Sequence, residues 1–296
     1  MFFTGARPRP VGYFASQTKM PVFGGSGVPI DWDKGWDIRN YLGGNIPFKN
    51  QKISLSCVGQ AWSYYAWVKQ MEELTAKYNK PLNELRKEMV EEFSAKAIYS
   101  QIFLAGGGAY VDAGGRVLVN WGEIEEYKVP SFRKKDLTDE EWMTDREWMT
   151  AMISKLAKVY RGASLHILRT QTNINTYAEA IMENLGVVGG VAGNNHSGWG
   201  SERPHPPDEI EWYHALYFGA FGKDERGKFI ATPNSWGDLL RKDWVQGAPP
   251  GYGWQKLYED YFTAEYMFDP FTYVDKLNPM ENDFVKIIKD KNSPAV

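Results

Sequence analysis

The order of apolar patterns along the chain predicts an α+β fold, with helices in the first half and strands in the second. In the first half, apolar residues recur every three to four positions, the period of an amphipathic helix. In the second half, short apolar runs rich in β-branched and aromatic residues stand between loops rich in glycine and proline, as expected for buried strands. The 296 residues suffice for a sizeable core, as one large domain or two smaller ones.

Three helices are predicted in the first half of the chain. The first covers 58–78, where apolar side chains recur on one face at helical spacing. The second covers 81–93 and begins with a proline in its first turn, where the missing N–H has no partner to lose. The third covers 111–121 and ends before Gly122.

One long helix is predicted in the middle of the chain, over 138–160. Thr138 is a suitable N-cap residue because its hydroxyl can accept from the first free backbone N–H groups. Three acidic residues follow it, and negative charge is favourable in the first turn of a helix.

A further helix and four strands are predicted in the second half. The helix covers 175–185 and ends before Gly186. The strands are expected at 187–193, 212–219, 229–232 and 252–257. A run of helices followed by a run of strands is typical of an α+β domain.

The only cysteine of the chain, Cys57, stands at the start of the first predicted helix. A helix N-terminus stabilises a thiolate through its backbone N–H groups and its dipole. A neighbouring imidazolium lowers the pKa of such a thiol further. Cys57 is therefore a candidate nucleophile, while a lone cysteine is otherwise a small buried apolar residue.

Two later segments supply partners for this nucleophile. His214 stands in the aromatic run Trp-Tyr-His-Ala-Leu-Tyr-Phe, and Asn234 opens the sequence Asn-Ser-Trp-Gly after the next strand. Gln51 precedes Cys57 by six residues. In order and spacing, these four residues resemble those of the papain-like cysteine proteases, in which Gln, Cys, His and Asn follow one another in the chain.

The resemblance implies a role for each of the four residues. Cys57 would be the nucleophile, and His214 the base that holds an ion pair with it and then protonates the leaving amine. Asn234 would orient the imidazole, as in the Cys-His-Asn form of the catalytic triad. Gln51 and the backbone N–H of Cys57 would donate to the oxyanion. Trp236 would shield the His-Asn hydrogen bond from water.

Substrate-binding residues follow from the same resemblance. Gly107 and Gly108 would pair with the extended backbone of a substrate, because glycine lets another chain approach closely. The alternative for this glycine run is a flexible turn. Val191 and Ala192 would form walls of the pocket for the second substrate side chain.

The sequence around the nucleophile departs from the family pattern Cys-Gly-Ser/Ala-Cys-Trp/Tyr. Ser54 stands where that pattern has its first cysteine, which removes a disulfide partner without affecting the chemistry. Leu55 replaces the glycine, and Val58 replaces the aromatic residue. Leu55 places a bulky side chain where the family keeps the wall of the cleft open, so it bears on which substrates can enter.

The resemblance also divides the chain. Residues 1–29, rich in proline and glycine, are expected to form an extended arm without regular structure, and 30–296 to form the papain-like domain. Within it, 30–122 would be the mainly helical half, 123–172 an insertion with the long helix, and 173–296 a mainly β half that resembles an antiparallel barrel. The cleft would lie between the halves. The arm either lies across this cleft or docks on the body of the protein or on an assembly partner.

Composition excludes several classes of function. The net charge is −3 and the basic residues are scattered, which does not fit a nucleic-acid-binding protein. No apolar stretch is long enough for a membrane helix. The first ten residues lack the apolar region of a secretory signal. A single cysteine fits a reducing compartment such as the cytoplasm, or the interior of a virion or another large assembly.

Metal chemistry is an alternative use of the histidines. His196, His205 and His214 are each nine residues apart, which does not match a short helical or finger motif, so no metal site is expected. Other Cys-His hydrolases, such as transglutaminases and cell-wall amidases, share the chemistry but should lack Gln51 and the Asn-Ser-Trp-Gly sequence. No cofactor is required by the predicted reaction.

The sequence therefore predicts a cysteine endopeptidase that cleaves peptides or proteins through an acyl-enzyme intermediate. The alternative is an inactive papain-like protein with a structural or binding role in an assembly, because a fold does not determine a function. Leu55 and Val58 favour that alternative, and the presence of all four candidate catalytic residues favours the enzyme.

Overall fold

The computed structural model describes residues 5–10, 13, 20–25, 27–85, 90–131, 136–157, 164–237 and 243–274. Its α-helices are α1 (Ile38–Leu42), α2 (Cys57–Tyr78), α3 (Ala95–Ile102), α4 (Val111–Asn120), α5 (Asp139–Thr144), α6 (Ala151–Ala157) and α7 (Ile174–Asn184). Its strands are β1 (Ala6–Arg7), β2 (Val22–Phe23), β3 (Trp36–Asp37), β4 (Ala109–Tyr110), β5 (Leu165–Leu168), β6 (Val187–Gly193), β7 (Trp212–Phe218), β8 (Ala220–Asp224), β9 (Gly227–Thr232), β10 (Gln255–Tyr258) and β11 (Met267–Tyr273). Two 3-10 turns cover Leu82–Glu84 and Glu259–Tyr261.

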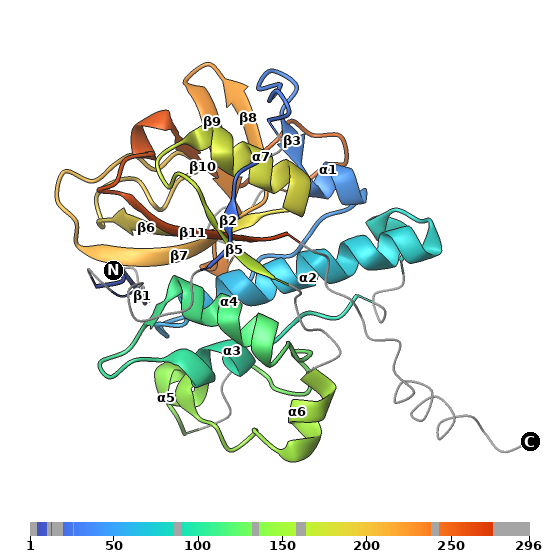
Figure 1. Cartoon of the computed structure of the whole chain (residues 1–296), viewed down its shortest axis with the longest axis vertical. Helices are drawn as coiled ribbons and strands as arrows, with labels where there is room; N and C mark the ends of the chain where they lie inside the picture. Colours follow the sequence, from blue (N-terminus) through green and yellow to red (C-terminus); the bar gives the residue numbers. More distant parts are fainter. Residues whose placement is uncertain are drawn as a thin grey trace, which may run out of the picture.

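Most strands form two sheets above helix α2, with α3 to α6 on its other side (Figure 1). The first sheet has the strand order β2-β5-β11-β6-β7, and the second has β10-β9-β8-β3. The α+β class is thereby confirmed. The β half is not a closed barrel, because each of these two sheets ends in edge strands within the described part of the chain.

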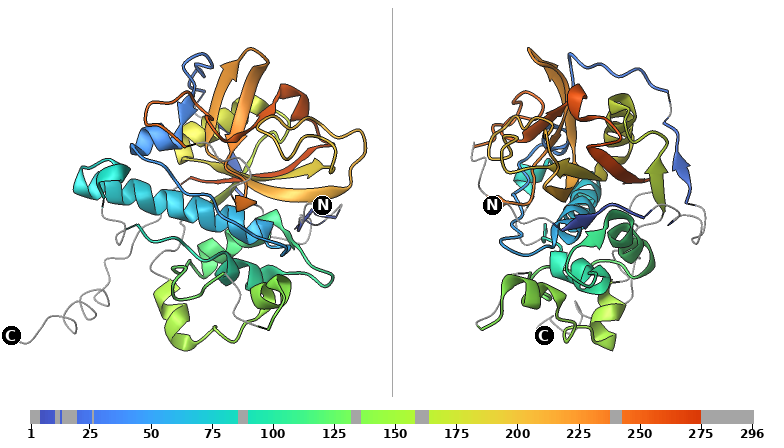
Figure 2. Two further views of the ribbon diagram at one scale, coloured as in Figure 1. Left: turned by 180° about the vertical axis from the view of Figure 1, so that it is seen from behind. Right: turned by 90° about the vertical axis from the view of Figure 1, so that its left-hand side faces the viewer.

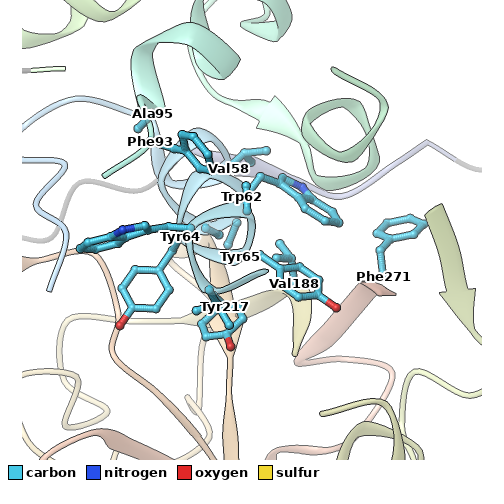
Figure 3. Close-up of a cluster of buried hydrophobic side chains, with 14 of the residues drawn as sticks. Val58, Trp62, Tyr64, Tyr65, Phe93, Ala95, Val188, Tyr217 and Phe271 are labelled. Atoms are coloured by element: carbon cyan, nitrogen blue, oxygen red, sulfur yellow. The ribbon is translucent and has the colours of Figure 1, made fainter. Parts of the chain in front are cut away.

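Helix α2 forms the centre of the molecule. Every residue of this helix from Cys57 to Glu72 is buried, and the helix contacts both the strands and the other helices. Figure 3 shows Tyr64 and Tyr65 of this helix close to Tyr217 of β7. The Tyr217 ring lies 5.0 Å from the Tyr64 ring and 5.5 Å from the Tyr65 ring. Large rings from one helix and one strand therefore hold the two parts of the fold together.

The predicted helix over 138–160 is wrong as a single element. The capping box at its start is present, with Thr138 and Glu141 as partners, but α5 ends at Thr144 and α6 begins only at Ala151. Asp145 has an extended backbone and accepts a hydrogen bond from Lys96 Nζ at 3.0 Å. This tertiary contact overrides the local helical preference. Residues 158–160 lie outside the described residues.

The predicted helix over 81–93 is also wrong where the structure describes it. Only the 3-10 turn Leu82–Glu84 forms, and 86–89 lie outside the described residues. Phe93 makes an isolated antiparallel bridge with Glu125, which requires an extended backbone. Pairing with a segment far along the chain therefore outweighs the helical spacing of apolar residues here.

The N-terminal arm has more regular structure than predicted. Strand β1 pairs in parallel with β4, and β2 pairs in parallel with β5. Both partners have an edge at which backbone N–H and C=O groups can pair with another strand. The arm is extended, as expected, but its hydrogen bonds tie it to the body of the protein.

Two further features of the described residues concern ligands and membranes. No helix in the described segments is both long and apolar enough to cross a membrane. Within the same segments, no group of three or more His, Cys, Asp or Glu side chains is arranged to hold a metal ion.

Candidate active site

Cys57 is the first residue of α2, as predicted, and its thiol is buried. The residue has 0% of its surface exposed. The sulfur accepts hydrogen bonds from two backbone N–H groups, that of Gly5 at 3.3 Å and that of Ala215 at 3.4 Å. One of these donors belongs to the N-terminal arm and the other to β7, so the thiol lies where the arm and the sheet meet the end of the helix.

His214 lies in the middle of β7, one residue before a donor to the thiol. Its Nε2 lies 2.8 Å from Oδ1 of Asn234. The indole ring of Trp236 stacks on the imidazole with a centroid distance of 4.7 Å and an interplanar angle of 21°. Asn234 and Trp236 therefore contact the histidine in the way that the Asn-Ser-Trp-Gly sequence predicts.

The side-chain amide of Gln255 determines how Asn234 presents its oxygen to the histidine. Gln255 Nε2 donates to two backbone carbonyls, those of Trp199 at 2.7 Å and Ser201 at 3.0 Å. Since carbonyls only accept, Gln255 must turn its Oε1 toward Asn234 Nδ2, which donates to it at 2.6 Å. Asn234 Oδ1 then faces the imidazole as an acceptor.

This chain of amides determines the tautomer of the neutral imidazole. Because Asn234 Oδ1 accepts, the proton must be on Nε2 of His214, and Nδ1 keeps its lone pair. Nδ1 is buried and has no hydrogen-bond partner among the described residues. A buried nitrogen with a free lone pair is suited to act as a base.

Burial keeps both groups of the candidate pair neutral in this structure. It raises the pKa of the Cys57 thiol to about 11, although the N–H groups of Ala215 and Gly5 act in the opposite direction. It lowers the pKa of His214 to about 4, although the hydrogen bond to Asn234 favours the charged form. Desolvation thus outweighs the hydrogen bonds, and a thiolate–imidazolium pair is disfavoured while the site is covered.

The N-terminal arm is what covers the site. Strand β1 lies between β4 on the helical side and the sheets on the other (Figure 2). The Gly5 carbonyl accepts from Ala109 N at 2.6 Å, and the guanidinium of Arg7 donates to the carbonyls of Gly106 and Gly107. Of the two alternatives for the arm, the structure supports the one in which it crosses Cys57.

Close packing requires glycine where the arm crosses. A Cβ atom added to Gly5 would lie 1.8 Å from the carbonyl oxygen of Leu55, and one added to Gly108 would lie 2.3 Å from the carbonyl oxygen of Gly5. Such distances are far inside van der Waals contact, so any side chain at Gly5 would push the arm away. Gly108 therefore lets the backbone of the arm approach closely, and the pairing of Gly107 and Gly108 with a substrate stays a prediction.

A carboxylate from α5 ties together the two loops beside the nucleophile. Glu140 accepts from Leu55 N at 2.7 Å and from the Tyr99 hydroxyl at 2.7 Å. The same hydroxyl accepts from Gly108 N at 2.9 Å. The chain thereby connects the nucleophile loop to the glycine run without a disulfide, for which its single cysteine would not suffice.

The side chain of Gln51 is buried in the nucleophile loop. Its Nε2 donates to the Ser54 carbonyl at 3.0 Å, and its Oε1 accepts from the Ser235 hydroxyl at 2.7 Å. Ser235 follows Asn234, so these bonds connect the loop that carries Cys57 to the segment that carries Asn234. The role of Gln51 as an oxyanion donor stays a prediction.

Val191 and Ala192 lie on β6 and are fully buried. Val191 pairs with His214 and belongs to the apolar cluster that includes Trp212. Ala192 pairs with Tyr213, which lies on β7 as His214 does. Val191 is thus part of the core in this structure, and the pocket-wall role of the two residues stays a prediction.

Sequence reasoning missed three residues that shape the site. Gln255 is one polar residue in a predicted strand, and a polar residue at a buried position of a strand is the signal that could have found it. Glu140 stands in an acidic first helical turn, and its separation of 85 positions from Leu55 gives no local signal of their contact. Gly5 carried no local signal for its contact with the thiol.

Comparisons with known proteins find matches among solved structures. No model of a protein family matches the sequence, and no curated relative matches it. Solved structures do match. Xylellain, a cysteine protease from Xylella fastidiosa, superposes with a TM-score of 0.67 at 14% identity, over 91% of this chain and 95% of that one. Procathepsin B S9 from Trypanosoma congolense has a TM-score of 0.62 at 13% identity, over 92% and 85%.

A plant structure agrees with these two. The bromelain protease from Ananas comosus, in complex with the inhibitor E64, has a TM-score of 0.56 at 16% identity and covers 81% of this chain and 98% of that one. All three are cysteine proteases. Because their sequences are at most 16% identical to this chain, the likeness concerns the fold alone. The chain therefore has the α+β fold of the papain-like cysteine proteases.

Proposed function

We propose that this protein is a cysteine peptidase in which Cys57 is the nucleophile and His214 its base. The observation that carries the proposal is the fixed tautomer of His214, held by Asn234 and Gln255 with a free lone pair on Nδ1. Cys57 accepts a hydrogen bond from the backbone N–H of Ala215, the residue after His214, and lies at the N-terminus of a 22-residue helix, whose dipole favours a thiolate.

The proposed reaction uses these groups in turn. His214 Nδ1 takes the thiol proton, and the sulfur of Cys57 attacks the carbonyl carbon of a peptide or protein substrate. The backbone N–H of Cys57 and the amide of Gln51 donate to the oxyanion. The imidazolium then protonates the nitrogen of the breaking C–N bond, the amine leaves, and water hydrolyses the thioester.

The covered site represents a latent form of this enzyme. The Gly5 N–H contacts the sulfur where a substrate carbonyl would have to lie, and the arm is paired along β4. Release of the arm would admit water and substrate, which removes the desolvation that disfavours the ion pair. Gly107 and Gly108 would then pair with a substrate instead, with Val191 and Ala192 nearby on β6.

The test uses a substitution that opens the site without altering it. In Gly5→Ala, the new Cβ would collide with the backbone of Leu55, so the arm should leave the thiol. We expect alkylation of Cys57 by an epoxysuccinyl probe to become about tenfold faster or more, as the thiol is exposed. Peptide hydrolysis should rise in parallel, and Cys57→Ala in the same background should abolish it.

Gly200→Ala is the matched control, because nothing lies within 4 Å of a Cβ at that position. It should leave the alkylation rate unchanged. Fast alkylation of Gly5→Ala without hydrolysis of any peptide would favour the alternative, an inactive binding protein. The buried thiol is the observation that supports this alternative. Hydrolysis that persists after Cys57→Ala would contradict the assignment of the nucleophile.

A further inference from the structure

Lys49 is a buried lysine in the segment that leads to Cys57. The residue is only 3% exposed, and its Nζ donates to the Glu92 carboxylate at 2.7 Å and to the Phe93 carbonyl at 2.6 Å. Burying a lysine costs side-chain entropy and hydration. The two charge-assisted hydrogen bonds offset this cost and hold the ammonium group in one place. Lys49 therefore fixes its own segment to the segment that leads into α3.

The backbone of segment 49–51 pairs with segment 235–237, which directly follows Asn234. The contacts are two hydrogen bonds and one antiparallel bridge, namely Gly237 N to Lys49 O at 3.0 Å, Gln51 N to Ser235 O at 2.8 Å, and Asn50 with Trp236. We call this pairing the 49–51 ladder. Because Lys49 holds one side of the ladder in place, the other side, which continues into Asn234, is held as well.

Asn234 needs such a restraint, because its backbone is strained. Its φ is +59°, in the left-handed region that residues other than glycine seldom adopt. Asparagine tolerates this region better than most residues, but the conformation persists only where the surrounding structure enforces it. From this conformation Oδ1 of Asn234 reaches Nε2 of His214. The hydrogen bond to Gln255 restrains the side chain of Asn234, and the 49–51 ladder restrains the backbone that follows it.

We propose that Lys49 is a positioning residue, which holds Asn234 against His214 through the 49–51 ladder. Without the ammonium group the ladder loses its fixed side, and the backbone of Asn234 can relax toward the extended region. Oδ1 then no longer keeps the imidazole proton on Nε2. This inference rests on the proposed peptidase function and adds to it a residue that acts through Asn234 rather than on the reacting atoms.

The first test reads the tautomer of His214 in the full-length, covered protein. In a ¹H–¹⁵N spectrum of the imidazole groups at pH 7, wild type should show His214 protonated on Nε2, with the signal assigned by its absence from His214→Gln. Lys49→Met keeps an unbranched apolar side chain without the donor. It should add a second population protonated on Nδ1, at about 10% of the signal. A spectrum of His214 that is unchanged in Lys49→Met would overturn the proposal.

Lys96→Met is the matched control. Lys96 is equally buried, at 1% exposure, and its Nζ pairs with Asp145 at 3.0 Å, but it belongs to α3 and not to the 49–51 ladder. It should destabilise the fold to a similar extent and leave the tautomer of His214 unchanged. A second tautomer in Lys96→Met as well would show a general effect of lost stability and would overturn the proposal.

A milder variant keeps the test informative if Lys49→Met does not fold. Glu92→Ala removes only one of the two acceptors of Lys49, and the Glu92 side chain is 37% exposed, so the fold should tolerate its loss. The second tautomer should appear here too, in a smaller population than in Lys49→Met. If Glu92→Ala folds and shows the Nε2 tautomer alone while Lys49→Met is unfolded, the role of Lys49 is one in stability and the proposal is overturned.

The activity test uses the opened enzyme and fluorescently labelled casein as the substrate. In the Gly5→Ala background, Lys49→Met should lower kcat about 100-fold, as expected when a catalytic group is displaced by about 1 Å, and should change KM by less than about threefold. A rise in KM with kcat unchanged would contradict a positioning role. A second tautomer in Lys49→Met, together with no hydrolysis by Gly5→Ala, would retain the role of Lys49 and contradict the peptidase. An active Gly5→Ala enzyme with an unchanged tautomer in Lys49→Met would do the reverse.

Discussion

At the scale of single residues, the candidate site depends on which groups are cut off from water. Cys57 and His214 are both fully buried, and desolvation moves their pKa values in opposite directions, to about 11 and about 4. Both shifts favour the neutral form. In the latent form proposed above, dehydration would therefore act against the ion pair together with the arm that covers the thiol.

The shifted histidine makes stability depend on pH. The unfolded chain binds a proton at His214 below its ordinary pKa of 6.5, whereas the folded chain does so only near 4. The free energy of unfolding should therefore fall as the pH is lowered from 6.5 to 4, by about 3 kcal/mol at most. Urea unfolding at a series of pH values measures this, and His214→Gln should flatten the slope.

His205→Gln is the control, because it removes a histidine that is exposed rather than buried. An identical pH dependence in wild type and His214→Gln would contradict the burial of a neutral imidazole. The buried thiol acts at the other end of the pH scale. Since its pKa is raised from 9.0, stability should fall as the pH rises from 9.0 toward about 11.

At the scale of elements, the short helix α5 supports the loop that precedes Cys57. Its residue Glu140 holds the Leu55 backbone and the Tyr99 hydroxyl, and that hydroxyl holds Gly108. The expected long helix could not make these contacts and also bring Asp145 to Lys96. Breaking the helix therefore lets α5 pack against both loops of the site.

Removing one oxygen of Glu140 should loosen these loops. In Glu140→Gln the amide nitrogen cannot accept, so either Leu55 N or the Tyr99 hydroxyl loses its acceptor. We expect a local cost of about 1–2 kcal/mol, and hence roughly tenfold faster amide exchange in 54–56 and 106–108. Hydrogen exchange with mass spectrometry measures this. Glu147→Gln is the control, because Glu147 is exposed beyond the end of α5, and it should have no effect. Unchanged exchange in Glu140→Gln would contradict the role of Glu140 in holding the two loops together.

At the scale of the whole molecule, helix α2 and the sheets share one aromatic interface. Tyr217 packs against two tyrosines of α2, and its hydroxyl donates to the Leu185 carbonyl at 2.5 Å. Cys57 is the first residue of α2, and His214 lies within β7. The same interface that stabilises the fold therefore sets the position of Cys57 relative to His214.

Loss of this ring should destabilise both parts of the fold at once. Tyr217→Ala removes a ring with 2% exposure and should cost about 3–5 kcal/mol, whereas Tyr127→Ala, at 65% exposure, should change stability by less than about 0.5 kcal/mol. Urea unfolding followed by circular dichroism and by tryptophan fluorescence measures the cost. Two separate transitions in Tyr217→Ala would mean that the halves are stabilised independently.

The sequence by itself determined the features that depend on neighbouring residues. It predicted that α2 begins at Cys57, that His214 lies in a buried strand, and that Asn234 and Trp236 contact it, because helix ends, apolar runs and short motifs are local patterns. Only the tertiary structure decided that Gly5 contacts a thiol 52 positions away, that Gln255 orients Asn234, and that Arg9 meets Asp269 across 260 positions. These contacts join segments that approach each other only when the whole chain packs. The packing energy depends on distant residues, so the sequence on either side of each contact does not predict it.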